Sequence, residues 1–178
     1  MRKNTYPGMF IVFEGIDGCG GETQSKKLVS YLKKRGMAAQ RLSYPDYKGP
    51  IGKLIHEYLY KRHDFSKEVQ LLLYFADFLK DNEKIQRWLA EGKTIVSDRY
   101  FSSTIAYQCS SGFAVEKAVQ MSTLFDLPVP DLILYLNITP ETSIKRKMKE
   151  KRGKLDRHEA DKKFLSDLVK LYKQLIQK

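Results

Sequence analysis

The chain has 178 residues, a length that suits one compact domain with a sizeable core. It is 42% hydrophobic and 30% charged, as globular proteins are, and no stretch approaches the roughly 20 apolar residues of a membrane span. The start, Met1 to Gly8, lacks the long apolar run of a signal peptide. Two cysteines, Cys19 and Cys109, do not make a disulfide framework. We therefore expect a cytoplasmic protein without a membrane segment.

Basic residues dominate the net charge, which is +11 at pH 7. The segment from Lys145 to Arg157 holds eight basic and two acidic residues, and so carries +6 of that charge. Such a run fits a solvated helix face, a nucleic-acid patch, or a segment that binds a small polyanion such as a nucleotide. Its neighbouring motifs have to decide among these readings.

Apolar runs and helical periodicity alternate along the chain. The sequence predicts, in order, a strand at 10–13, a helix at 23–35 ended by Gly36, a weaker strand at 38–44, a helix at 51–61, a helix from 67 to about 80 capped by Ser66, and a helix at 85–91 ended by Gly92. Strands at 94–97 and 132–136, a helix opened by Pro140, and a last helix at about 159–177 follow.

This alternation predicts parallel β-α-β units in a single domain that spans residues 1–178. In such sheets ligands bind beyond the carboxyl ends of the strands. The helix from 67 to about 80 is apolar on nearly every side, so it has to be buried in the core or against a second subunit.

A glycine-rich turn follows the first predicted strand and precedes a helix, as in a P-loop. Its backbone N–H groups and the helix N-terminus suit phosphate. The predicted phosphate-binding residues are Gly15, Gly18, Cys19, Gly20, Gly21, Glu22 and Thr23. We therefore expect a three-layer α/β fold of the P-loop NTPase type, with a parallel sheet of about four to five strands flanked by helices.

The loop departs from the pattern G-x-x-x-x-G-K-[ST], because Gly21 stands at the lysine position and Glu22 at the hydroxyl position. Loss of one charge-assisted hydrogen bond costs roughly 1.5–3 kcal/mol, or about 10- to 150-fold in binding. Glu22 can compete with ATP for the helix N-terminus, ligate Mg²⁺ directly, or pair with Lys26 one turn on.

Motifs along nearly the whole chain resemble those of the thymidylate kinase family. They are the opening strand and loop at 10–24, Tyr44-Pro45, the run at 72–77, the block from Ser97 to Gln108, Pro130-Asp131-Leu132, and Asp156-Arg157-His158-Glu159 with Phe164 and Tyr172. The block from Asp98 to Gln108 is the most specific of these. The resemblance implies a homodimer and the reaction ATP + dTMP → ADP + dTDP with Mg²⁺.

The resemblance also implies roles for individual residues. Asp17 faces the acceptor's 3′-hydroxyl and the phosphates, Arg99 binds the acceptor phosphate with its planar fork, and Asp98 holds Mg²⁺ or orients the arginine. Tyr74 stacks on the base and Tyr107 packs on the deoxyribose. The base pocket is bordered by Thr104, Gln108, Tyr44, Pro45 and Phe78. From composition alone Asp17 is equally a turn residue, Arg99 a partner of Asp98, and Tyr74 a core aromatic.

The basic segment at about 145–157 resembles the family's lid, which closes arginines onto the transferring phosphoryl group. Arg146, Arg152 and Arg157 are the candidates. Because the charge lies where a lid belongs, a nucleic-acid role is not expected.

Two further departures concern the acceptor base and the adenine. Phe78 stands where the family has an arginine that reads thymine, and Phe cannot donate that hydrogen bond. The sequence offers no candidate for the family's fifth strand and last helix, so we expect adenine contacts that are reduced or supplied by another chain. Two alternatives to a dTMP kinase therefore stay open: an impaired nucleotide-binding or regulatory relative, and a kinase for another pyrimidine monophosphate.

Overall fold

The computed structural model describes residues 4–110, 112 and 114–176. Four strands form one parallel sheet in the order β2-β3-β1-β4; they are β1 (Phe10–Glu14), β2 (Ala39–Ser43), β3 (Thr94–Asp98) and β4 (Leu132–Tyr135). The helices are α1 (Gly21–Lys34), α2 (Pro50–Leu59), α3 (Lys67–Leu79), α4 (Asn82–Ala90), α5 (Phe101–Ser110), α6 (Val115–Leu124), α7 (Pro140–Glu150) and α8 (Lys162–Ile176).

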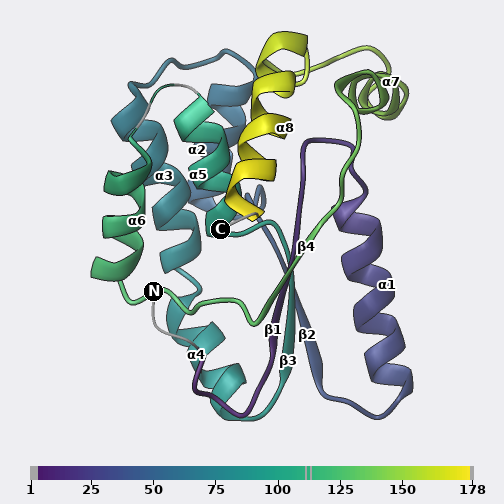
Figure 1. Cartoon of the computed structure of the whole chain (residues 1–178), viewed down its shortest axis with the longest axis vertical. Coiled ribbons are helices and arrows are strands. Elements are labelled where there is room, and N and C mark those ends of the chain that lie inside the picture. Colours follow the sequence, from purple (N-terminus) through teal and green to yellow (C-terminus); the bar gives the residue numbers. More distant parts are fainter. Residues whose placement is uncertain (1–3, 111, 113, 177–178) are drawn as a thin grey trace.

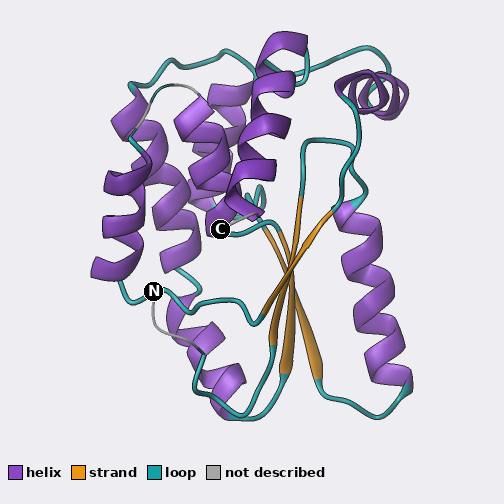
Figure 2. Ribbon diagram, viewed as in Figure 1, coloured by secondary structure: helices purple, strands orange, loops and turns teal. Residues whose placement is uncertain are grey.

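The sheet lies between two layers of helices. Figure 1 shows α1 on one face and α3, α4, α5, α6 and α8 on the other, and Figure 2 shows the strands crossing between them. Val29 and Leu32 of α1 pack on Phe13 and Val96. This arrangement confirms the three-layer α/β prediction, with four strands.

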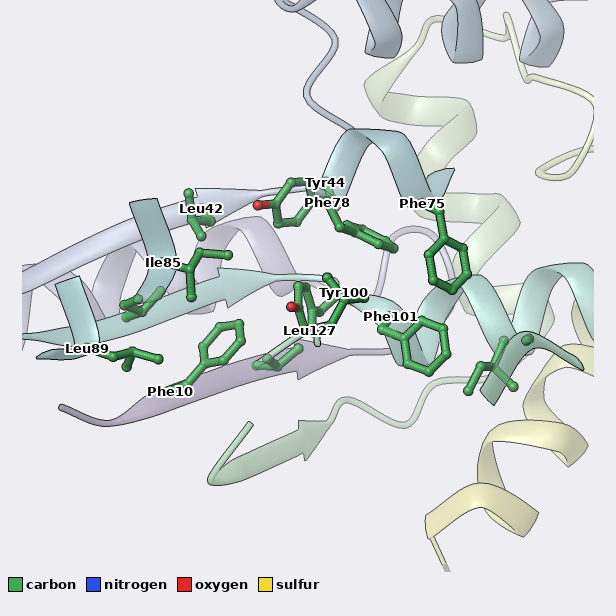
Figure 3. Packing of buried hydrophobic residues seen from close by; sticks show 14 of the residues in the cluster. Phe10, Leu42, Tyr44, Phe75, Phe78, Ile85, Leu89, Tyr100, Phe101 and Leu127 are labelled. Atoms are coloured by element: carbon green, nitrogen blue, oxygen red, sulfur yellow. The ribbon is translucent and has the colours of Figure 1, made fainter. Parts of the chain in front are cut away.

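The largest core cluster fills the face opposite α1. Phe10, Leu42 and Ile95 of the sheet meet side chains from α3, α4, α5 and α6 there (Figure 3). A smaller cluster around Leu165, Leu168 and Tyr172 fastens α8 to Ile16 and α5. The carboxyl ends of β1 and β3 therefore lie between a packed core and the C-terminal helix.

Helix-boundary signals in the sequence are mostly confirmed. The Ser66 side chain caps α3 by accepting from Val69 N, and Pro140 is at the first turn of α7. Gly36 and Gly92 follow α1 and α4 with φ of 76° and 73°, where a side chain would be strained. The predicted start of the last helix at Glu159 is wrong, since α8 begins at Lys162; the predicted end at residue 177 lies outside the described residues.

Two helices, α5 and α6, lie where the sequence analysis made no helix prediction. Six of the ten residues of α5 are buried, including Ser103, Thr104 and Gln108. A helix enclosed on most sides and rich in small polar residues has no apolar stripe to reveal it.

The apolar helix α3 is only partly enclosed. Leu71, Phe75 and Phe78 are buried, but Leu72 is 53% exposed and Val69 is 40% exposed. Burial in the core of this chain therefore does not cover all of the apolar surface of α3. Among the described residues no helix has the length and apolar character needed to cross a membrane.

Candidate functional site

The loop after β1 has the backbone geometry of an anion site. Gly18 and Gly20 have φ of 73° and 101°, a region open to glycine. Gly20 caps α1 without a side-chain hydrogen bond, and the Gly21 N–H is directed at the Cys19 sulfur. The N–H groups of this first turn have no partner within the helix itself. An anion at this terminus gains both those donors and the helix dipole.

A partly buried ion pair lies beside the loop. Arg99 Nη2 donates to Asp17 Oδ1 at 2.9 Å, Arg99 Nη1 donates to the Gly15 carbonyl at 2.7 Å, and Tyr107 OH donates to Asp17 Oδ2 at 2.9 Å. Burial raises the pKa of Asp17, but the Arg99 charge and the Tyr107 hydrogen bond outweigh it and hold that pKa below its usual range. The alternative that Arg99 pairs with Asp98 is wrong. Arg99 has φ 66°, a strained conformation of the kind found at functional sites.

A buried acid, Glu14, holds Ser103, which in turn contacts Arg99. Its carboxylate accepts from the backbone N–H groups of Tyr100 and Ser103 and from the hydroxyls of Ser103 and Tyr172. Ser103 Oγ lies 3.2 Å from Arg99 Nη1 and accepts from it. Burial raises the pKa of Glu14 to about 7, although these hydrogen bonds and Arg99 oppose the rise. The sequence analysis missed this role, because Glu14 reads there only as the end of a strand.

Asp98 ends β3 and pairs with a residue that the sequence analysis did not single out. Arg41 Nη2 of β2 lies 3.5 Å from Asp98 Oδ2, and Arg41 Nε donates to Ser25 Oγ at 2.9 Å. Burial raises the pKa of Asp98 despite the nearby Arg99 and Arg41 charges. Gly21 lies directly against this carboxylate, because a Cβ added at Gly21 would clash with Asp98 Oδ1.

Glu22 is turned along the surface of α1 and forms an exposed ion pair with Lys26, as its spacing predicted. The Lys26 hydrogen bond is the main cause that lowers the pKa of Glu22. Thr23 is exposed on the same turn. In this arrangement the Glu22 carboxylate is engaged with Lys26, and that pairing favours the third of the three roles considered for it.

Helix α7 lies against the loop. Ser143 Oγ donates to the Asp17 carbonyl at 2.6 Å, and Arg146 Nη1 donates to the Gly18 carbonyl at 3.0 Å. A side chain at Gly18 would touch Lys147 Cγ, so glycine there lets α7 approach closely. Arg146 is therefore the one of the three predicted lid arginines that the structure brings to the loop.

The other two lid arginines lie elsewhere. The Arg157 guanidinium is 3.9 Å from the centroid of the Tyr58 ring and pairs with Asp64 at 2.8 Å. Arg152 is exposed with φ 50°. Lys151, next to Arg152 in the sequence, pairs with Asp156 at 3.2 Å and with Glu159 at 2.7 Å. These ion pairs connect the segment to the residues just before α8.

The residues predicted for the base pocket divide into two groups. Tyr74 is half-buried among side chains of α2, and its pKa is raised by burial. Thr104 Oγ1 and Gln108 Oε1 are buried and have no hydrogen-bond partner among the described residues, which is costly unless a ligand supplies one. Pro45 is partly exposed next to this region.

Tyr44 and Phe78 form the second group, and both pack in the largest core cluster. Phe78 is 2% exposed and packs edge-on against Tyr44 at 4.9 Å and near Tyr100 at 5.3 Å (Figure 3). Tyr44 donates its hydroxyl to Asp81 at 3.0 Å. Thr104 and Gln108 are equally enclosed, at 2% exposed each, so contact of any of these four side chains with a base stays a prediction.

Comparisons with known proteins agree with this geometry. The family model for thymidylate kinase matches residues 13–178. The chain is 35% identical to a thymidylate kinase of Caenorhabditis elegans over 155 residues, which cover 82% of this chain and 70% of the relative. It is 34% identical to one of Thermoanaerobacter over 173 residues, which cover 94% and 85%. The solved thymidylate kinase of Candida albicans superposes with a TM-score of 0.75 at 28% identity and covers 97% of this chain and 79% of its own.

Proposed function

Because this chain belongs to the thymidylate kinase family, we propose that it transfers the terminal phosphoryl group of ATP to dTMP and yields ADP and dTDP. The chain is thus a phosphotransferase. The observation that carries the proposal is the hydrogen-bonded, partly buried set of Asp17, Arg99 and Tyr107, which lies beside a glycine-rich loop at the carboxyl ends of β1 and β3.

Arg99 is the residue that binds the acceptor phosphate. Asp17, the Gly15 carbonyl and Ser103 hold its guanidinium in place before substrate arrives. A planar guanidinium in a partly dehydrated site binds phosphate strongly and needs little reorganisation at the moment of transfer. Asp17 can also accept from the 3′-hydroxyl of the acceptor, and the Tyr107 ring can pack on the deoxyribose.

The donor phosphates occupy the loop from Gly15 to Thr23. The N-terminus of α1 and the backbone of the loop supply N–H donors there. A bound Mg²⁺ would supply positive charge against the charge that develops on the phosphates. Asp98 would hold it, because its carboxylate has the hard oxygen that Mg²⁺ prefers and lies beside the first residue of α1. Glu22 is the second candidate ligand.

The base pocket is lined by Tyr74, Thr104 and Gln108. A thymine ring offers one N–H donor and two carbonyl acceptors on its edge, and the unpaired Gln108 Oε1 and Thr104 Oγ1 match such an edge. Tyr74 supplies a ring face for stacking. Tyr44 and Phe78 back this pocket from the core.

The segment at about 145–157 acts as the lid of this single domain. Arg146 already contacts the loop through the Gly18 carbonyl. Arg152 and Arg157 reach the transferring group only after the Lys151 network and the Arg157–Asp64 pair rearrange. This proposal requires a closed state that differs from the one described here.

A homodimer and a cytoplasmic location complete the proposal. The exposed Val69 and Leu72 on α3 supply an apolar surface for a second copy, and both cysteines are free. Analytical ultracentrifugation of the wild type and of Leu72→Lys tests the interface. A monomer at all concentrations in the wild type, or a dimer that Leu72→Lys leaves intact, would remove α3 from the proposal.

A coupled ADP-release assay with Mg·ATP and each nucleoside monophosphate tests the function. We expect turnover with dTMP in preference to purine nucleotides. A chain that binds ATP but turns over no monophosphate would be an impaired relative. Turnover of another pyrimidine nucleotide ahead of dTMP would reassign the acceptor.

A further inference from the structure

The loop lacks a lysine at its seventh consensus residue, where Gly21 stands, so the donor phosphates need another cation. We infer that Arg41 supplies it: the Arg41 guanidinium, held between Ser25 and Asp98 at the start of α1, binds the donor phosphate chain. This inference deepens the proposed function and rests on it for the identity of the nucleotide.

The sheet register brings Arg41 to the loop. β2 pairs with β3 so that Arg41 stands opposite Val96 and Ser43 opposite Asp98. Side chains alternate along a strand, so Arg41 points to the same face as Ala39, which packs with α1. Arg41 lies two residues before the end of β2. Its long side chain, on this face of the sheet, reaches the start of α1.

Two contacts fix the guanidinium there. Arg41 Nε donates to Ser25 Oγ at 2.9 Å, and Ser25 Oγ donates in turn to the Glu22 carbonyl. Nη2 reaches Asp98 at 3.5 Å, the limit of a hydrogen bond. Within the described part of the chain, Nη1 has no hydrogen-bond partner. The fork is therefore positioned by one strong contact and keeps donors for an anion.

Gly21 makes room for this arrangement. A Cβ at position 21 would meet Asp98 Oδ1, so the carboxylate lies in the space that a longer residue would need. One contacting group is therefore formed by Gly21, Asp98 and Arg41. Its positive charge comes from Arg41 of β2, because the loop has no lysine at position 21. The Arg41 charge also contributes to lowering the pKa of Glu22, which places it within reach of the helix N-terminus.

The Arg41 side chain is accessible. It is 23% exposed and borders a hollow of about 520 Å³ along α1, which is also lined by Lys26 and, in the last turn of the helix, by Lys33 and Lys34.

Lys147 is the strongest rival for the role. It packs on Gly18, and its charge also acts on Asp17 and Glu22. However, its ammonium group is engaged by Glu150 at 2.9 Å and by Glu159 at 3.4 Å. Lys147 therefore has anionic partners of its own, and it serves as the comparison in the experiment.

The experiment compares Arg41→Met, Arg41→Gln and Lys147→Met with the wild type and with Arg87→Met, an exposed arginine on α4. Affinity for a fluorescent ATP analogue is measured without acceptor, and KM is measured for ATP and dTMP. We expect Arg41→Met to weaken ATP binding about 10- to 150-fold, as for one charge-assisted hydrogen bond, with KM for dTMP changed less than about 3-fold. Arg41→Gln keeps a donor for Ser25 without the charge and replaces Arg41→Met if that variant fails to fold.

Three outcomes decide the inference. Unchanged ATP affinity in Arg41→Met or Arg41→Gln would overturn it, and so would a larger loss in Lys147→Met than in either. In Arg41→Met, adding Gly21→Lys should recover most of the ATP affinity, because Asp98 is then free to move; a further loss would also overturn it. Since binding is measured without dTMP, a chain that binds ATP through Arg41 but does not phosphorylate dTMP would sink the proposed function and leave this inference standing.

Discussion

The two ends of the site differ in how firmly their charges are held. At the acceptor end, Arg99 donates to Asp17 at 2.9 Å and to the Gly15 carbonyl at 2.7 Å, and Tyr107 donates to Asp17 at 2.9 Å. At the donor end, Arg41 and Asp98 stand 3.5 Å apart, and the Glu22–Lys26 pair is exposed on the helix surface. Short, partly buried pairs with several hydrogen bonds are costly to break, whereas long pairs and exposed pairs contribute little. Substitutions at the acceptor end should therefore affect both folding and activity, and substitutions at the donor end mainly ATP binding.

Arg99→Ala should have the largest effect. It leaves the partly buried Asp17 carboxylate without its main partner, which costs about 1–3 kcal/mol of unfolding free energy. It also removes the acceptor-phosphate contact, so kcat/KM for dTMP should fall about 10²- to 10³-fold. Urea unfolding and steady-state kinetics measure the two effects. Arg87→Ala on the exposed side of α4 is the matched control, and an Arg99→Ala protein with normal KM for dTMP would contradict the assignment.

Glu14→Gln should change the pH dependence of stability at the acceptor end. The pKa of Glu14 is about 7 in the folded chain and lower when unfolded, because burial disfavours the charged form. Between those values the unfolded state has released the proton that the folded state keeps, so stability falls as pH rises from about 4.5 to about 7. Across that window the loss is at most about 3 kcal/mol.

Glutamine imitates the protonated acid: its Oε1 can accept from the backbone N–H groups of Tyr100 and Ser103, and its Nε2 can donate to the hydroxyls of Ser103 and Tyr172. The Glu14→Gln variant should therefore lose less stability than the wild type between pH 5 and pH 8, as measured by thermal melting at each pH. Parallel curves for the two proteins would show that Glu14 does not titrate in this window. A matched change at Glu150, which is exposed, should leave the pH curve as it is.

The same contrast separates what the sequence could predict from what it could not. The loop, Asp17 and Arg99 could be predicted, because an apolar strand, glycines and an adjacent motif are local signals. The partners of these residues come from distant segments: Ser143 lies 126 positions from Asp17, and Arg41 lies 57 from Asp98. Such contacts depend on strand order and on how α7 and α8 dock, which a linear pattern does not encode.

Phe78 shows a second limit of the sequence. Helix α3 is apolar on nearly every side, so periodicity cannot tell which of its residues face the core. The structure places Phe78 against Tyr44 and Tyr100 and leaves Leu72 in solvent. A different limit concealed α5, which is enclosed on most sides and rich in small polar residues and so has no apolar stripe.

Gly21→Ala tests the donor end with one added methyl group. The new Cβ would clash with Asp98 Oδ1, which has to rotate and so leaves its weak pair with Arg41. Overpacking of this kind costs about 1–3 kcal/mol, toward the lower end where a side-chain tip can move. We expect the KM for ATP to change more than the KM for dTMP. An Ala substitution at Gly36, which has open space for a Cβ but positive φ, controls for backbone strain alone.

Lys26→Met should have the smallest effect and so sets the baseline for the donor end. Lys26 and Glu22 are both largely exposed, and an i,i+4 pair on a helix surface contributes about 0.3–0.5 kcal/mol that salt screens further. The unfolding free energy should change by no more than that.

The freed Glu22 carboxylate then remains next to the helix N-terminus, where it is favoured by the dipole and stands close to the donor phosphates. If ATP affinity nevertheless falls more than about 5-fold at low salt and recovers at high salt, Glu22 competes with the donor phosphates, and Lys26 is the residue that keeps it away. An unchanged affinity would leave Arg41 and Asp98 as the charges that matter at this end.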